Sequence, residues 1–171
     1  IVPNEEMLRS YAALKGISAL DEQTAKQGAA EEERFLRSFP FHPELTEVFY
    51  SKWTNLSGFQ RTRGVLRTFA LALRATAKWD SSPLIGPAVF LNAANQDELS
   101  EAARELVTYA ESDGDGGSRQ AWTGILEMEF RHARQIQLES VGLKSREIEQ
   151  AVMAVFLHSQ PIGLSAKTRD L

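Results

Sequence analysis

Apolar residues recur at every third or fourth position along most of the chain, which is the spacing of one face of an α-helix. The pattern predicts helices at about residues 4–16, 18–39, 43–53, 59–79, 99–110, 122–136 and 145–156, with the second weakened at Gly28. No strong alternation of apolar and polar positions, which would mark a half-buried strand, appears along the chain. We therefore predict an all-α fold, a compact bundle of six or seven helices.

Proline and glycine mark where these helices end. PFHP, residues 40–43, breaks the helical pattern, and Pro43 suits the first turn of the helix that follows. Residues 55–58 predict a turn in which Ser57 is a candidate cap. The segment at residues 80–91, which ends in SPLIGPAVFL, holds two prolines and a glycine, so we expect an ordered loop with a short extended piece. SDGDGGS, residues 112–118, predicts a flexible connector.

The apolar stripes also predict which side chains face the core. We expect inward packing from two helices by Leu66, Phe69, Leu73, Ile148, Val152, Val155 and Phe156. Ser145 is the expected cap of the last helix. The three tryptophans offer surfaces on which nucleic-acid bases could stack, but each lies in helical phase with apolar neighbours. We therefore expect Trp53, Trp79 and Trp122 to pack in the core or at its rim.

Composition places the chain among globular proteins. Its 171 residues are 43% hydrophobic and 25% charged, and we interpret them as one helical domain with leading (1–38), central (39–91) and trailing (92–171) helices. The net charge of -4 gives no global case for nucleic-acid binding, so any basic site must be local. Cysteine is absent, which favours a reducing, cytoplasmic setting. No run is apolar for long enough to span a membrane, and both ends look like cuts in a longer protein.

Four arginines stand out in GFQRTRGVLRTFALALRA, residues 58–75. In a helix, Arg63, Arg67 and Arg74 fall within about 40° of one another, with Lys78 near the same stripe. Arg61 points almost opposite to Arg63. The stripe has two interpretations, since its cations are either solvated or paired with acids of neighbouring helices, or they bind an anion. The planar guanidinium suits phosphate because it makes bidentate, permanently charged contacts.

The other candidate chemistry is weak. We expect His42 to order the PFHP turn through a backbone hydrogen bond, His132 to face solvent and His158 to lie at a rim, and their spacing predicts no metal site. DGDGG, residues 113–117, resembles the start of a calcium loop, but Gly124 stands where the bidentate Glu should be. These residues contain no G-x-x-x-x-G-K-[ST] loop and no G-x-S-x-G elbow. We expect neither tight ATP binding nor hydrolysis by these residues alone.

One stretch carries a family resemblance. FPFHPELTEVFYSKWTNLSGFQRTRGVLRTFALALRA, followed by SPLIGPAVFL, resembles part of the large prokaryotic predicted ATPases of the AAA+ superfamily, which are catalogued as a domain of unknown function. VFLHS, residues 155–159, fits a later helix of that family. The resemblance covers residues 39–91 well and the final helix moderately. It implies that this chain is a helical lid and the helices after it, with a P-loop core upstream that holds ATP and Mg²⁺.

The resemblance also implies a role for the arginines. In AAA+ proteins an arginine near the start of a lid helix, called sensor 2, reaches the γ-phosphate of ATP. GFQR offers Arg61 for this role and TRGVLR offers Arg63, with Arg67 as a support on the same face. Neighbouring subunits or DNA are the further partners that such a lid implies. The alternative is a helical module for binding protein or nucleic acid. Its contacts to DNA phosphates or to an acidic partner would come from Arg63, Arg67, Arg74 and Lys78.

Overall fold

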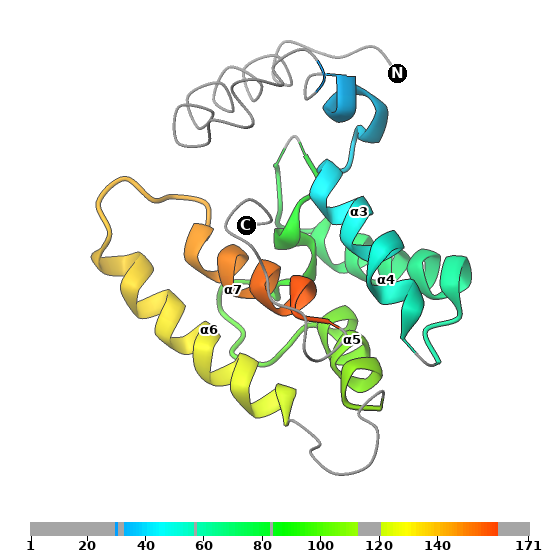
Figure 1. Ribbon diagram of the computed structural model, residues 1–171. Coiled ribbons are helices and arrows are strands. Elements are labelled where there is room, and N and C mark those ends of the chain that lie inside the picture. The colour runs from blue at the N-terminus through cyan, green and yellow to red at the C-terminus, as the bar shows by residue number, and fades with distance from the viewer. Residues whose placement is uncertain (1–29, 31–32, 57, 83, 113–120, 161–171) are drawn as a thin grey trace. The chain divides into compact units, whose positions relative to one another are not determined.

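The structure, a computed structural model, describes residues 30, 33–56, 58–82, 84–112 and 121–160 (Figure 1). In these ranges the chain forms the helices α3 (Pro43–Ser51), α4 (Arg61–Thr76), α5 (Glu101–Ser112), α6 (Trp122–Glu139) and α7 (Glu147–His158), with short 3-10 helices η1 (Trp53–Asn55) and η2 (Pro87–Phe90). Residues 33–38 are helical as well, and no strand occurs in the described ranges. The all-α prediction is therefore confirmed for this part of the chain. The helix expected at 4–16, the first part of the helix expected at 18–39, Ser57 and the 113–117 connector lie outside it.

The chain divides into two compact units. The first comprises Ile1–Thr46 and Ser81–Gly86, and the second comprises Glu47–Asp80 and Pro87–Leu171. α3 starts in the first unit and ends in the second, so the boundary falls within a helix rather than in a linker.

In the first unit, the PFHP turn lies beside residues 84–86 of the loop that precedes η2. Phe41 and Ile85 form an isolated parallel bridge, in which the Ile85 N–H donates to the Pro40 carbonyl at 2.8 Å and the His42 N–H donates to the Ile85 carbonyl at 2.9 Å. This bridge is the short extended piece expected in the loop. His42 Nδ1 accepts a hydrogen bond from the Glu44 N–H at 3.3 Å, which confirms that His42 orders the turn. The helix after the turn begins at Pro43, as predicted.

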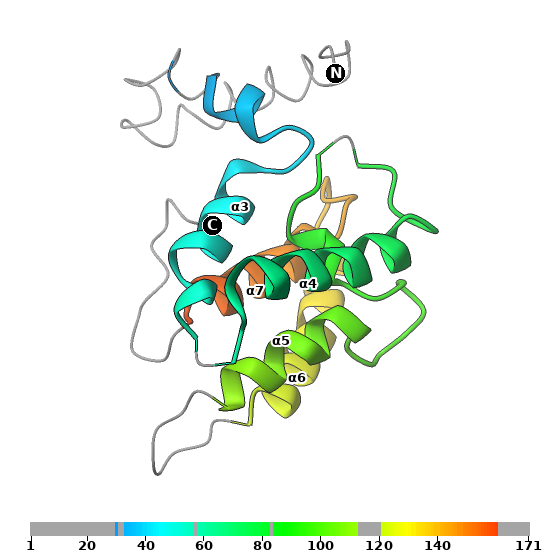
Figure 2. The same ribbon diagram turned by 90° about the vertical axis from the view of Figure 1, so that its right-hand side faces the viewer.

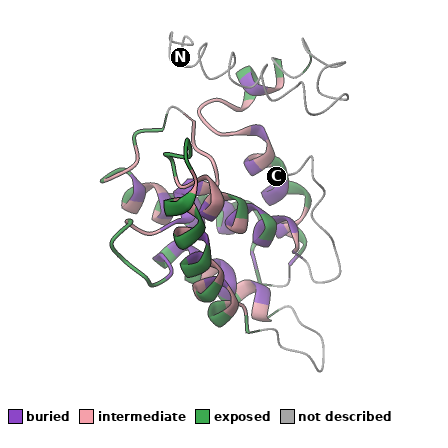
Figure 3. Ribbon diagram, turned by 90° about the vertical axis from the view of Figure 1, so that its left-hand side faces the viewer, coloured by how far each residue is buried: buried purple, intermediate pink, exposed green. Residues whose placement is uncertain are grey.

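In the second unit, four long helices pack in pairs (Figures 1 and 2). α4 packs on α5, α6 packs on α7, and α5 also contacts α6. The 3-10 helix η2 contacts both α4 and α7, and η1 contacts α4. Buried and exposed positions alternate along each helix with the helical period, as Figure 3 shows by colour. The unit is therefore held by the inward faces of amphipathic helices.

A chain of aromatic rings forms the centre of this unit. Neighbouring centroids lie 5.0–6.0 Å apart, in tilted, stacked or edge-on pairs that are favourable for aromatic rings. The members are Phe49, Trp53, Phe59, Phe69, Phe90, Tyr109, Trp122 and Phe156. Trp53 is fully buried, whereas Trp122 and Trp79 are half-buried. The expectation of core or rim positions for the tryptophans is confirmed.

The end of α7 is capped from a distant part of the chain. Trp53 Nε1 donates to the Leu157 carbonyl at 3.0 Å, and Lys52 Nζ donates to the His158 carbonyl at 2.6 Å. These carbonyls belong to the last turn of the helix, where no intrahelical donor reaches them and where a cation is favoured. His158 itself is buried, so its predicted place at a rim is wrong.

Three other local predictions are also wrong. Leu66 and Val155 are 66% and 42% exposed, although both were expected to face the core. Ser145 does not cap α7, because the helix starts at Glu147 with Arg146 in the left-handed region and no side-chain cap. The Glu147 carboxylate instead accepts from the Ser145 N–H at 3.0 Å. Glu147, in the first turn of α7, therefore supplies the acceptor for a backbone N–H group that precedes the helix.

Candidate functional site

The chain turns sharply just before α4, the helix that carries the arginines. Gln60 and Arg61 have φ values of 30° and 45°, in the left-handed region that residues with a Cβ seldom occupy. Phe59 is fully buried and anchors the turn in the aromatic core. A Cβ added to Gly64 would lie 2.3 Å from the Phe59 carbonyl oxygen, so only glycine fits there. The turn thus fixes where Arg61 and Arg63 leave the backbone.

Electrostatics at the start of α4 favours an anion. No acidic residue stands in the first turn, and no side chain caps the helix. The helix dipole places partial positive charge at this end, and Arg61 and Arg63 add two full charges to it. Both arginine side chains are exposed, and neither forms a hydrogen bond or an ion pair with any described residue. Repulsion between like charges at this end is therefore not relieved by the described part of the protein.

Farther along α4, the same stripe is paired with acids. Arg67 Nε lies 2.8 Å from Glu105 Oε1, and Arg74 Nη2 lies 3.3 Å from Glu101 Oε2. Both acids belong to α5, which packs on α4. Lys78, beyond the end of α4, is exposed and forms no ion pair with the described residues. The paired-stripe interpretation thus holds for Arg67 and Arg74. Arg61, Arg63 and Lys78 form no ion pair with the described residues, and of these only Arg61 and Arg63 lie at the start of α4.

Glu105 connects the arginine stripe to the turn. Its Oε1 accepts a hydrogen bond from the Tyr109 hydroxyl at 3.3 Å and also forms the ion pair with Arg67 Nε. Burial raises the pKa of Tyr109, and the charge and hydrogen bond of Glu105 raise it further. The Tyr109 ring lies edge-on to Phe59, with centroids 5.1 Å apart. One series of contacts therefore runs from the turn through Tyr109 and Glu105 to Arg67.

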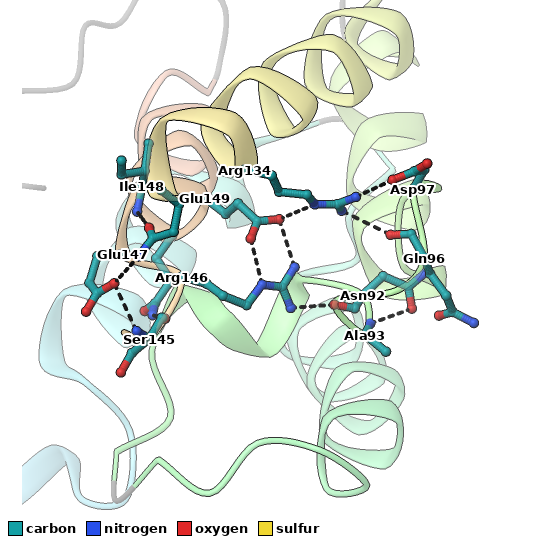
Figure 4. A network of polar contacts seen from close by, with 12 residues as sticks. Asn92, Ala93, Gln96, Asp97, Arg134, Ser145, Arg146, Glu147, Ile148 and Glu149 are labelled. Carbon is teal, nitrogen blue, oxygen red and sulfur yellow. Dashed lines mark hydrogen bonds and ion pairs between the residues drawn. The ribbon is translucent and has the colours of Figure 1, made fainter. Parts of the chain in front are cut away.

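A second arginine cluster, which the sequence did not indicate, lies between α6 and α7. Glu149 is 2% exposed and accepts from Arg134 Nε at 2.8 Å and from Arg146 Nε and Nη2 at 2.7 and 2.8 Å (Figure 4). Burial alone would raise the pKa of Glu149, but the hydrogen bonds and charges of Arg146 and Arg134 hold it below its usual value. The Arg146 guanidinium also lies 5.3 Å from the centre of the Trp79 ring, a cation–π distance.

The same two arginines also donate hydrogen bonds to the loop that precedes α5. Arg134 donates to the Gln96 carbonyl at 3.0 Å and pairs with Asp97 at 2.5 Å (Figure 4). Arg146 donates to the Asn92 carbonyl at 2.6 Å. Because the donors of this cluster are directed to protein acceptors, we interpret it as a structural clamp. An acid within the apolar stripe of α7 is the one sequence signal that could have revealed it.

Nearby, hydrogen bonds also lower the pKa of a second acid at the start of α7. Burial alone would raise the pKa of Glu147, but bonds from backbone N–H groups and from Gln137 Nε2 outweigh it. Among the described residues, no group of three His, Cys, Asp or Glu side chains is placed to hold a metal ion.

His132 is exposed on α6, as expected.

None of the helices among the described residues has the length and apolar character needed to cross a membrane. Comparisons with protein-family models, with curated proteins and with solved structures found no match for this chain. What the chain does must therefore be inferred from its own residues and their geometry.

Proposed function

We propose that this helical domain is the nucleotide-responsive lid of an AAA+-type ATPase, in which Arg61 or Arg63 approaches the γ-phosphate of ATP. The observation that carries the proposal is the pair of exposed arginines at the start of α4, which no acid of the described residues neutralises. Guanidinium groups stabilise the charge that develops on a phosphoryl group during transfer. ATP and Mg²⁺ would be bound mainly by a separate core, in a cytoplasmic protein whose subunits contact one another.

The backbone of the turn supports the proposal. A sensor must keep its arginine at a defined position, since an error of about 1 Å in placement weakens catalysis strongly. The buried ring of Phe59 and the close approach of Gly64 to its carbonyl restrict that position. Backbone strain of the kind seen at Gln60 and Arg61 persists only where surrounding packing enforces it.

The contacts of α4 suggest how such a lid would relay a signal. α4 packs directly on α5, to which the Arg74–Glu101 pair also joins it, and it packs on η2 as well. A shift of α4 towards a phosphate would therefore move α5 with it. Lid closure would in this way change the surface offered to a neighbouring subunit.

The test is ATP hydrolysis by the protein that carries both this domain and the ATP-binding core. Arg61→Ala and Arg63→Ala are compared with wild type, and Arg74→Ala is the matched control, because Arg74 lies on the same helix but is paired. Loss of the sensor arginine should lower turnover by about tenfold or more, while Arg74→Ala stays near wild type. Wild-type turnover in both the Arg61 and the Arg63 variants would refute the sensor role.

The domain alone should bind ATP weakly, because its residues contain no phosphate-binding loop. Isothermal titration of this chain with ATP measures that affinity. A dissociation constant below about 1 mM would contradict the proposal that ATP is bound mainly by the separate core.

A second candidate is a module that binds DNA or an acidic protein through the same surface. It is favoured by the exposure of Arg67 and Arg74, whose side chains remain 68% and 73% accessible despite their ion pairs. Binding of DNA by this chain that weakens steeply across a salt series would support it. DNA binding without any loss of ATP turnover in the arginine variants would favour this module over the lid.

A further inference from the structure

Glu105 has an unusual environment for an acid that pairs with a surface arginine. Its side chain is only 14% exposed, whereas that of Arg67 is 68% exposed. The partner contacts described above all involve Oε1, and Oε2 is buried without any hydrogen-bond partner among the described residues. A carboxylate can accept about four hydrogen bonds, so Glu105 is under-satisfied and attracts further donors.

Arg67 contacts Glu105 through only one of its three guanidinium nitrogens. The pair uses Nε, and the terminal nitrogens of Arg67 have no partner among the described residues. These terminal nitrogens form the fork that binds phosphate oxygens in a bidentate manner. An anion can therefore contact Arg67 before the pair with Glu105 is broken.

Arg63 lies one helical turn before Arg67 on the same face, about 40° away around the helix. A phosphate group that contacts Arg63 is therefore within reach of Arg67. Glu105 then competes with the phosphate for the same cation. If Arg67 leaves, the Tyr109 hydroxyl still donates to Glu105, so the acid keeps one partner.

We propose that Glu105 is an internal counter-ion of the arginine surface, and that a phosphate-bearing ligand competes with it for Arg67. Glu105 would thus lower phosphate affinity in the ligand-free protein and release Arg67 to support Arg63 in the bound one. This role rests on the proposed phosphate recognition by the arginines of α4. It makes Glu105 a positioning residue, acting through Arg67 without touching the ligand.

The test is titration of this chain with inorganic tripolyphosphate at low ionic strength, followed by the backbone amide NMR signals of residues 61–67. Glu105→Gln should tighten binding by about threefold, the scale of an exposed ion pair. Glu101→Gln removes the same charge from the same helix at the Arg74 pair, and it should bind as wild type does. Glu105→Asp, which keeps the charge, should restore affinity towards wild type.

A double variant tests whether Glu105 acts through Arg67. In an Arg67→Ala background, Glu105→Gln should give no further gain, because the pair is already lost. Equal gain in both backgrounds, or unchanged or weaker binding by Glu105→Gln, overturns the role of Glu105.

Arg61→Ala and Arg63→Ala in the same titration separate this inference from the lid itself. If they weaken binding while Glu105→Gln has no effect, only the counter-ion role fails. If both variants bind as wild type does, the arginines are not phosphate ligands and both proposals fail. If wild type shows no binding, the counter-ion role of Glu105 fails, whereas the lid, which holds ATP only together with its core, is decided by the turnover of the Arg61 and Arg63 variants.

Discussion

Arg67 and Arg134 each form an ion pair with a glutamate of a neighbouring helix, but the two pairs lie in opposite surroundings. Glu149 is 2% exposed and receives three hydrogen bonds from two arginines that are themselves largely buried. Arg67 is mostly exposed and keeps its terminal nitrogens open to ligands, as far as the described residues show. An arginine whose three guanidinium nitrogens each donate to a protein acceptor is part of the folded core, whereas one held by a single contact can still bind a ligand.

The largest effect should come from breaking the buried cluster. Glu149→Ala leaves Arg134 and Arg146 largely buried without their shared counter-charge, which should lower the free energy of unfolding by about 3 kcal/mol. Urea denaturation measures the loss. Glu101→Ala is the matched control at the exposed pair with Arg74, and it should change stability by less than about 0.5 kcal/mol. Similar losses of stability in both variants would mean that the buried cluster contributes no more to stability than the exposed pair does.

Two glycines, Gly64 on α4 and Gly124 on α6, differ in the space around them. Gly64→Ala should lower stability by about 2 kcal/mol, because the new Cβ meets the Phe59 carbonyl oxygen and the turn must shift. Gly124→Ala, on α6 with open space around the site, should raise stability by about 0.5–1 kcal/mol through helix propensity. Thermal unfolding should therefore show a lower melting temperature for Gly64→Ala and a higher one for Gly124→Ala than for wild type. A neutral Gly64→Ala would mean that the turn before α4 is not rigid.

A smaller effect should appear when pH is varied. The folded pKa of Glu149 lies below its ordinary value of 4.5, so the unfolded chain takes up the proton first as the pH falls. The stability that Glu149 contributes is therefore present above about pH 4.5 and is lost as the pH falls through the folded pKa. Wild type should exceed Glu149→Gln in unfolding free energy at pH 7, and the difference should narrow under acid. A difference that stays constant down to about pH 3 would contradict this origin of the stability.

Much of the fold could be predicted from the sequence, because helical periodicity and proline are local signals. Pro43 begins α3 as expected, and the loop before η2 contains, at Ile85, the short extended piece that was expected there. That this piece pairs with Phe41 was not predicted. The inward face of α4 was misjudged because it contains Thr68 and Thr76 rather than Leu66. Hydrophobicity alone does not indicate that small residues fill a close helix contact. The start of α4 was placed too early, since Phe59 enters the core and the chain turns before Arg61.

The site could be predicted only in part. The arginine stripe follows from helical spacing, but which of its members are neutralised depends on α5. Glu105 is distant from Arg67 in sequence, and only the packing of the two helices brings them together. Glu149 likewise meets Arg134 through the pairing of α6 and α7. Such contacts are tertiary, so no local pattern identifies the arginine that either acid meets.

The sensor role of Arg61 or Arg63 is tested most directly by ATP hydrolysis in the protein that carries both this domain and the ATP-binding core. Arg61→Ala, Arg63→Ala and the control Arg74→Ala are measured side by side. If an arginine at the start of α4 senses the γ-phosphate, one of the first two variants loses turnover by about tenfold or more while folding normally, and Arg74→Ala does not. Equal turnover in all three variants and wild type would contradict the sensor role and would leave the start of α4 without a role at ATP.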